Sequence, residues 1–162
     1  MTSLLSRVRQ LANDTALPPH LLQTRQWEGS LCRVRLDNTG SDATSVDRWV
    51  LFDGKLGLPV ESAIYGEGFQ MLAQTMGSWQ SPQHVGRCPD ASVYRITDDN
   101  GYHTIHNLLL VEHNKGWLLL AFASCHRFGG EFRLYPDGRL QILMNCSRWA
   151  LAERGTDLPR RG

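Results

Sequence analysis

The histidines are the first side chains to test for chemistry, because a neutral imidazole binds metal ions and a titrating one transfers protons. His103 and His106 are three residues apart, and in an extended strand this spacing sends their side chains to opposite faces. Cys125 and His126 are neighbours, so the same alternation separates this thiol from its nearest base. The segment 101–106 also lacks the His-x-His pair with a following glutamate that metal-binding cupin-like barrels use. We therefore expect no metal site and no cofactor.

Acidic residues could form a catalytic pair, since glycoside hydrolysis uses two carboxyl groups that flank the scissile bond. The candidates are Asp53, Glu61, Glu67, Asp98, Asp99 and Glu131. Most of them lie in turn-rich segments, where aspartate hydrogen-bonds its own backbone and stays in water. Glu67 differs because a glycine flanks it on each side, and a tight backbone bend there would present its carboxylate to a ligand. Phe69 and Gln70 follow after Gly68, beside this predicted bend.

Motifs for covalent and nucleotide chemistry are missing from the sequence. There is no Gly-x-Ser-x-Gly sequence, which places the nucleophile in many hydrolases. The segment Gly66-Glu67-Gly68 has no third glycine and no strand-to-helix context, so it does not predict a dinucleotide site. We assign no catalytic residue from the sequence.

Five tryptophans divide into two groups by their sequence context. Trp27, Trp49, Trp117 and Trp149 lie in or near strand patterns, and we expect them in the core. Trp79 lies in the irregular segment 76–82, and we expect it to be exposed. An exposed tryptophan can stack on the apolar face of a sugar ring or fill a pocket on a partner. Trp79 is therefore a predicted contact residue.

The elements that would position these side chains are short strands separated by glycine-containing turns. Residues 31–36 alternate between apolar and charged side chains, and we expect them to form a hairpin with residues 45–52. The run 117–123 is apolar on both faces, which predicts a central strand. Other predicted strands are 92–96, 104–111, 131–135 and 139–145. This spacing predicts an all-β fold, an antiparallel sandwich or barrel, of which we favour a supersandwich-like β-sandwich.

Three segments follow from this pattern. Leu4, Val8 and Leu11 recur at helical spacing, so residues 1–20 form an N-terminal segment with a predicted short helix. Residues 21–153 form the predicted β-sandwich domain, and residues 154–162 form a polar, arginine-rich tail.

Length and charge exclude several classes of protein. A chain of 162 residues is too short for a complete (β/α)₈ barrel, which needs about 250 residues. The formal net charge is +1 without a dense basic patch, so we expect no nucleic-acid partner. No apolar run approaches the length of a signal peptide core or a membrane span, so we expect no membrane partner and a cytoplasmic location. The four cysteines form no CxxC pair and are expected to be buried thiols.

Four segments of the chain are similar to those of a known family: Leu51–Pro59, Ala63–Thr75, Asn107–Leu110 and Leu118–Phe132. They resemble the N-terminal β-sandwich region of bacterial α-galactosidase-like proteins of glycoside hydrolase family 36, close to the raffinose synthase group. The resemblance extends from about Trp27 to Asn145, and its most specific parts are Gly66–Gln70 and Ser124–Phe132. The tail 154–162 departs from the family, which suggests a truncated gene product or an isolated domain.

In such enzymes a (β/α)₈ barrel follows the sandwich and carries two catalytic aspartates. These aspartates have no matching positions in this chain. The resemblance therefore implies a noncatalytic accessory domain that packs on a barrel, shapes the rim of its active site or mediates contacts between copies. Its implied partners are a catalytic barrel domain, α-galactoside sugars or a second copy of the chain. The residues expected to contact the barrel or a sugar are Glu67, Phe69, Gln70 and Trp79.

Two alternatives stay open. The chain could be a free-standing carbohydrate-binding β-sandwich that uses Trp79 and nearby polar residues. It could also be a small mutarotase-like sugar enzyme with a histidine and a glutamate as acid and base. Close approach of His103, His106 or His126 to a carboxylate in a cleft would favour this second alternative.

Overall fold

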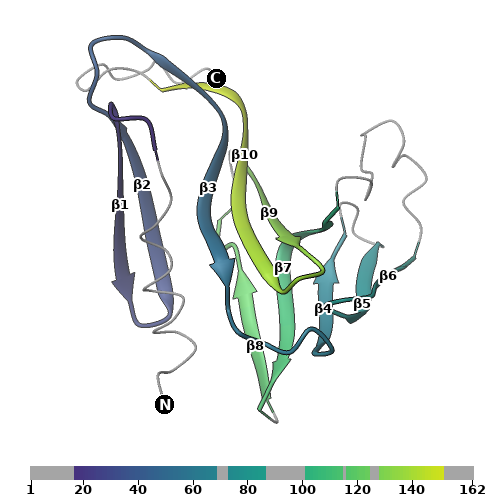
Figure 1. Ribbon diagram of the computed structural model, residues 1–162. Coiled ribbons are helices and arrows are strands. Elements are labelled where there is room, and N and C mark those ends of the chain that lie inside the picture. Colours follow the sequence, from purple (N-terminus) through teal and green to yellow (C-terminus); the bar gives the residue numbers. More distant parts are fainter. Residues whose placement is uncertain (1–16, 69–72, 87–100, 115, 125–127, 152–162) are drawn as a thin grey trace.

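The computed structural model describes residues 17–68, 73–86, 101–114, 116–124 and 128–151. The described residues form ten antiparallel strands (Figure 1). They are β1 (Leu21–Glu28), β2 (Leu31–Asn38), β3 (Thr44–Lys55), β4 (Ala63–Glu67), β5 (Gln74–Ser78), β6 (Pro82–Val85), β7 (His103–His113), β8 (Gly116–Ala121), β9 (Gly129–Leu134) and β10 (Arg139–Leu151). The predicted all-β sandwich is confirmed, whereas the predicted helix and the strand 92–96 lie outside the described residues.

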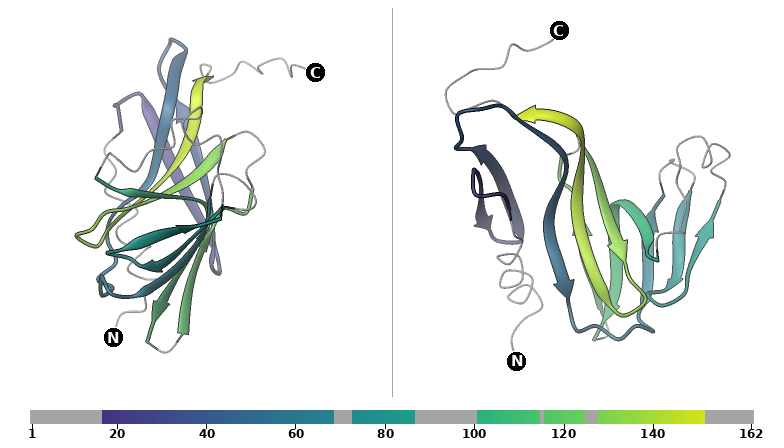
Figure 2. Two further views of the ribbon diagram at one scale, coloured as in Figure 1. Left: turned by 90° about the vertical axis from the view of Figure 1, so that its right-hand side faces the viewer. Right: turned by 45° about the horizontal axis from the view of Figure 1, so that its top comes forward.

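Two sheets make up the fold. Strands β1 and β2 form a two-stranded sheet, and the other eight form a sheet in the order β3, β10, β9, β7, β4, β5, β6, with β8 paired to β7. The larger sheet curls along this order, so that β3 and β6 stand at its two ends (Figure 2). No described residue belongs to a helix long and apolar enough to cross a membrane.

The hydrophobic core consists of two apolar clusters, and the smaller of them packs the two sheets together. The larger cluster fills the inner face of the curled sheet with Phe52, Ile105, Leu109, Phe132 and other buried side chains. The smaller one joins Val46, Trp49 and Cys146 of the large sheet to apolar side chains of β1 and β2. Exposed and half-buried residues alternate along β1, and along β2 as far as Leu36, so each strand has one half-buried face.

The predicted hairpin of 31–36 with 45–52 is wrong. Strand β2 pairs with β1, and β3 pairs with β10, more than 80 residues later in the chain. The connection between β2 and β3 is held by Asn38, which is buried. Its side-chain Nδ2 donates to the Asp42 carbonyl at 2.7 Å, and its Oδ1 accepts from the Gly40 amide at 3.0 Å. This turn carries the chain from one sheet to the other instead of reversing it within one sheet.

The predicted central strand at 117–123 is also wrong. Its regular part, β8, pairs only with β7 among the described strands, and Trp117 and Leu119 are 59% and 56% exposed. The strand with neighbours on both sides is β7. A left-handed residue, Asn107 (φ 58°), lies where β7 changes its partner from β9 to β8, and its carbonyl accepts from the Phe122 amide at 2.9 Å.

Candidate functional site

Trp79 is the candidate whose position differs most from the sequence prediction. It is only 2% exposed and belongs to the main core cluster, so the predicted exposed loop tryptophan is wrong. Its backbone N–H donates to the Ser62 carbonyl at 3.0 Å, and its indole Nε1–H donates to the Tyr135 carbonyl at 2.9 Å. Both N–H donors of Trp79, in the backbone and in the indole, thus have acceptors. A tryptophan whose N–H groups are bonded in this way can be buried in an apolar interior.

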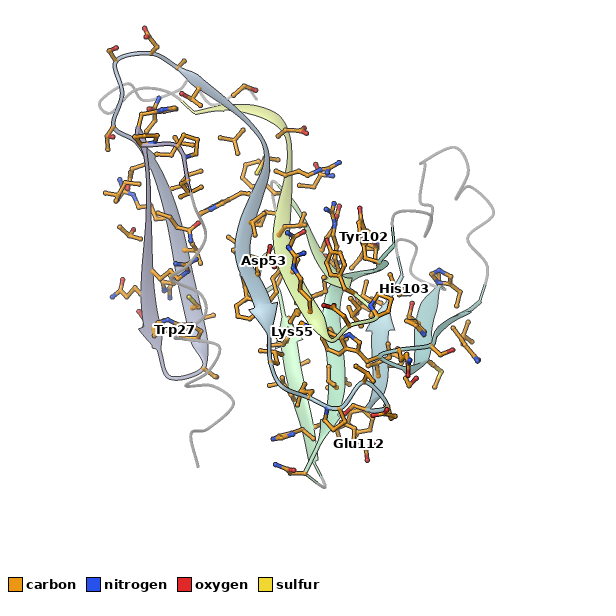
Figure 3. All side chains as sticks on the ribbon, viewed as in Figure 1. Trp27, Asp53, Lys55, Tyr102, His103 and Glu112 are labelled. Carbon is orange, nitrogen blue, oxygen red and sulfur yellow. The ribbon has the colours of Figure 1, made fainter. Side chains whose placement is uncertain are left out.

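Trp79 forms one wall of a small pocket at the start of β7. The cavity has a volume of about 240 Å³. Its lining residues are Trp79, Gln80, Pro82, Gly101, Tyr102, His103, Leu134 and Pro136. Two of them, Tyr102 and His103, lie at one end of β7, while Glu112 lies at the other end (Figure 3). The pocket is small for an organic ligand and suits a single ring.

The buried imidazole of His103 gives the pocket a fixed polar group. His103 is 8% exposed, and its Nε2 lies 2.9 Å from the hydroxyl of Thr75, which is fully buried on β5. The ring of His84 on β6 contacts the His103 ring with centroids 4.6 Å apart. These contacts from two neighbouring strands hold the orientation of the imidazole beside the cavity.

A stacked series of side chains holds Tyr102 at the mouth of the pocket. The guanidinium of Arg133 lies over the Tyr102 ring, 4.7 Å from its centroid. The rings of Tyr102 and Tyr135 are 5.3 Å apart, and Arg139 lies 4.8 Å from the centroid of Tyr135. Cation–π contacts of this kind favour one position of the aromatic ring. Arg139 is itself fixed, because Nε and Nη2 donate to the two oxygens of Asp53 at 2.6 Å each.

On the opposite, outer face of the sheet, Glu67, His106 and Glu131 are direct cross-strand neighbours on β4, β7 and β9. Glu131 is nearly buried and accepts from Arg133 at 3.2 Å and from Asn145 at 3.4 Å. Burial lowers the pKa of His106 below its usual value, and the nearby Glu131 carboxylate partly opposes this. His106 therefore favours its neutral form, although it lies between two carboxylates.

The four predicted contact residues are not brought together by the fold. Glu67 is exposed on the outer face of β4, whereas Trp79 is buried on the inner side of the same sheet. Phe69 and Gln70 lie outside the described residues. The sequence does not predict that Tyr102, His103 and Leu134 form one site. Leu134 lies on β9, which becomes a neighbour of β7 only in the folded sheet. Their only local signal is the aromatic and histidine pair at 102–103.

The expected absence of a metal site concerns the whole chain, but the structure describes only part of it. Within that part, no three His, Cys, Asp or Glu side chains lie close enough to hold a metal ion. Cys32 is half-buried and Cys146 is buried, and this burial raises the pKa of the Cys146 thiol.

The lowered pKa of His106 predicts a pH-dependent stability. The unfolded chain, whose histidine has a pKa of about 6.5, binds more protons than the folded chain as the pH falls through this value. The contribution of neutral His106 to the free energy of unfolding is therefore complete above pH 6.5. It is lost as the pH falls toward the pKa that His106 has in the folded chain. Each unit by which the two pKa values differ corresponds to about 1.4 kcal/mol.

Urea unfolding at a series of pH values between about 7.5 and 5 measures this effect. We expect His106→Gln to lose less stability than the wild-type chain over this range. His20→Gln is the control, because His20 is exposed and should leave the pH profile unchanged. An identical profile for the His106→Gln and wild-type chains would show that His106 does not cause the dependence.

Comparison with known proteins returned no match to any family model, to any curated protein or to any solved structure.

Proposed function

We propose that this chain is a noncatalytic β-sandwich domain that binds a small, uncharged, sugar-like ring in the pocket beside Trp79. The observation that carries the proposal is the composition of the pocket. Aromatic and apolar side chains form most of its described lining, His103, Gln80 and Tyr102 supply polar atoms, and none of the lining residues is Asp, Glu, Lys or Arg. A ligand with a formal charge would find no partner of opposite sign there, whereas a neutral polyhydroxylated ring finds both apolar contact and hydrogen-bonding groups.

The positions of the charged side chains support a noncatalytic role. Asp53 is held by Arg139 and by Gln141, whose Nε2 donates to Asp53 Oδ2 at 3.0 Å. These hydrogen bonds lower the pKa of Asp53, since they stabilise its ionised form. A carboxylate held in this way is a poor proton donor at neutral pH. Its contacts serve to position Arg139 and, through it, the Tyr135 ring.

The α-galactosidase resemblance stays a prediction, and no comparison supports it. Under this hypothesis the chain would be an accessory domain, and its ligand would be an α-galactoside. The cytoplasmic location likewise remains a proposal.

Calorimetric titration with galactose, melibiose and raffinose tests the proposal. We expect binding heat with at least one of these sugars, and we expect Tyr102→Ala to weaken this affinity about tenfold or more, because the ring forms part of the pocket mouth. Tyr65→Ala is the matched control, since Tyr65 lies on the outer side of β4, away from the pocket. Absence of heat with all three sugars, or equal affinity in the wild-type and Tyr102→Ala chains, would refute the proposal.

One observation favours the mutarotase-like alternative. His106 lies directly opposite Glu131 in the sheet, and a histidine beside a carboxylate is a possible acid and base pair. This pair predicts that the chain speeds the interconversion of α- and β-galactose and that Glu131→Gln reduces the rate at least a hundredfold. Polarimetry measures this reaction directly. Catalysis lost in Glu131→Gln, with folding intact by circular dichroism, would replace the binding proposal with an enzymatic one.

A further inference from the structure

Strand β8 is an unusual edge of the large sheet. Among the described strands it pairs only with β7, so its other edge presents backbone N–H and C=O groups that have no strand to pair with. Each of its six residues is exposed or half-buried. Its sequence, Gly-Trp-Leu-Leu-Leu-Ala, contains no charged residue and no proline. Soluble proteins usually protect such an edge with lysine, proline or a bulge, and β8 has none of these.

The apolar character of the edge continues across the outer face of the sheet. Met76, Tyr65, Leu110 and Leu119 are successive cross-strand neighbours on β5, β4, β7 and β8. Met76 at one end is 44% exposed, and Leu119 at the other end is 56% exposed. Trp117, also on β8, is 59% exposed and lies opposite Glu112 of β7. An uninterrupted apolar row that ends at an open strand edge is typical of an interaction surface.

We propose that a second copy of this chain covers this edge, through antiparallel pairing of β8 with β8 of the other copy. A two-fold axis at Leu119 brings the two Leu119 side chains together and places Trp117 opposite Ala121 of the other copy. The largest side chain of the strand thus faces the smallest apolar one. The apolar row then continues from the large sheet of one copy into the large sheet of the other, on the same face.

Charge also favours self-pairing over a charged partner. The paired strands carry no ionisable side chain, so two identical edges meet without like charges. The Glu112 carboxylate lies one strand further in, on β7, opposite Trp117. A basic or acidic peptide would find no opposite charge on β8 itself. The isologous contact satisfies the backbone groups of both edges at once.

A cysteine cross-link tests the register of this dimer. Opposed residues in an antiparallel pair have Cα atoms about 4.5–5.5 Å apart, which a disulfide can span. We expect Leu119→Cys to form a covalent dimer under mild oxidation. Trp117→Cys is the matched control, because its neighbour across the axis is Ala121. The double variant Trp117→Cys with Ala121→Cys should cross-link again, and the wild-type chain shows the background from native cysteines.

Sedimentation equilibrium tests the dimer without oxidation. We expect a reversible dimer of the wild-type chain and a monomer for Leu119→Lys, because the lysine places a charge at the two-fold axis. Met76→Lys is the control: it changes another exposed apolar residue, at the far end of the row, and should leave the dimer intact. A wild-type chain that stays monomeric at millimolar concentration, or a dimer that survives Leu119→Lys, would overturn the proposal.

Discussion

Replacing Trp79 with alanine is expected to lower the free energy of unfolding by about 3–5 kcal/mol. The side chain is 2% exposed and packs in the cluster that also contains Ile105, Phe132 and Leu134. Its removal would leave a cavity, and it would also remove the donor to the Tyr135 carbonyl. Cavity formation and a lost hydrogen bond act in the same direction. Urea unfolding, monitored by far-ultraviolet circular dichroism, measures the loss of stability as a lower urea concentration at the midpoint of unfolding.

Trp117→Ala is the matched control for this experiment, since it removes the same side chain from a site that is 59% exposed. Its expected effect lies within about 0.5 kcal/mol. Both substitutions are best compared in the Leu119→Lys background. Dimer formation through β8 would otherwise make the measured free energy of unfolding depend on the protein concentration. Equal losses for the two tryptophans would contradict the buried position of Trp79.

Replacing Gly66 with alanine is expected to lower the free energy of unfolding by about 1–3 kcal/mol. A Cβ atom at this position would lie 2.3 Å from Cγ2 of Ile105 and 2.8 Å from its Cδ1. Ile105 is 0% exposed, so its side chain has no free space in which to move. Gly66 is thus required by close packing between β4 and β7, which explains one glycine of the segment 66–70 without a functional role.

Two further variants isolate this steric effect. Gly129→Ala is the control, because a Cβ there has no neighbour within 4 Å and the backbone does not adopt a positive φ. We expect little loss of stability from it. In an Ile105→Ala background the penalty of Gly66→Ala should largely disappear, since the clashing atoms are gone. Additive losses in the double variant would mean that Gly66 is needed for a reason other than contact with Ile105.

The prediction from sequence succeeded where the information was local. The segment Tyr135-Pro136-Asp137-Gly138 predicts a hairpin turn, and the structure has it between β9 and β10. Gly138 adopts φ 82° there and donates to the Tyr135 carbonyl at 3.0 Å. Turn chemistry of this kind depends on the few residues in the turn, so it can be identified without knowledge of the fold.

The prediction failed where burial depends on distant strands. The irregular segment around Trp79 suggests a surface loop, yet the Ser62 carbonyl binds the backbone N–H of Trp79, and its indole donates to the Tyr135 carbonyl within the main core cluster. The apolar run at 117–123 suggests a central strand, yet β8 is an edge. An apolar pattern shows that a surface avoids water, but it does not distinguish a core from an interface between molecules.

The amino-acid sequence by itself determined the all-β class, most strand positions and the turns, because alternation of side chains and glycine chemistry act over a few residues. Only the tertiary structure decided which strands are neighbours, and therefore which side chains meet. The Arg139 and Asp53 pair is 86 residues apart in the chain, and the pocket combines residues from three separate segments, 79–82, 101–103 and 134–136. These contacts depend on strand pairing across long loops, and no local pattern encodes that pairing.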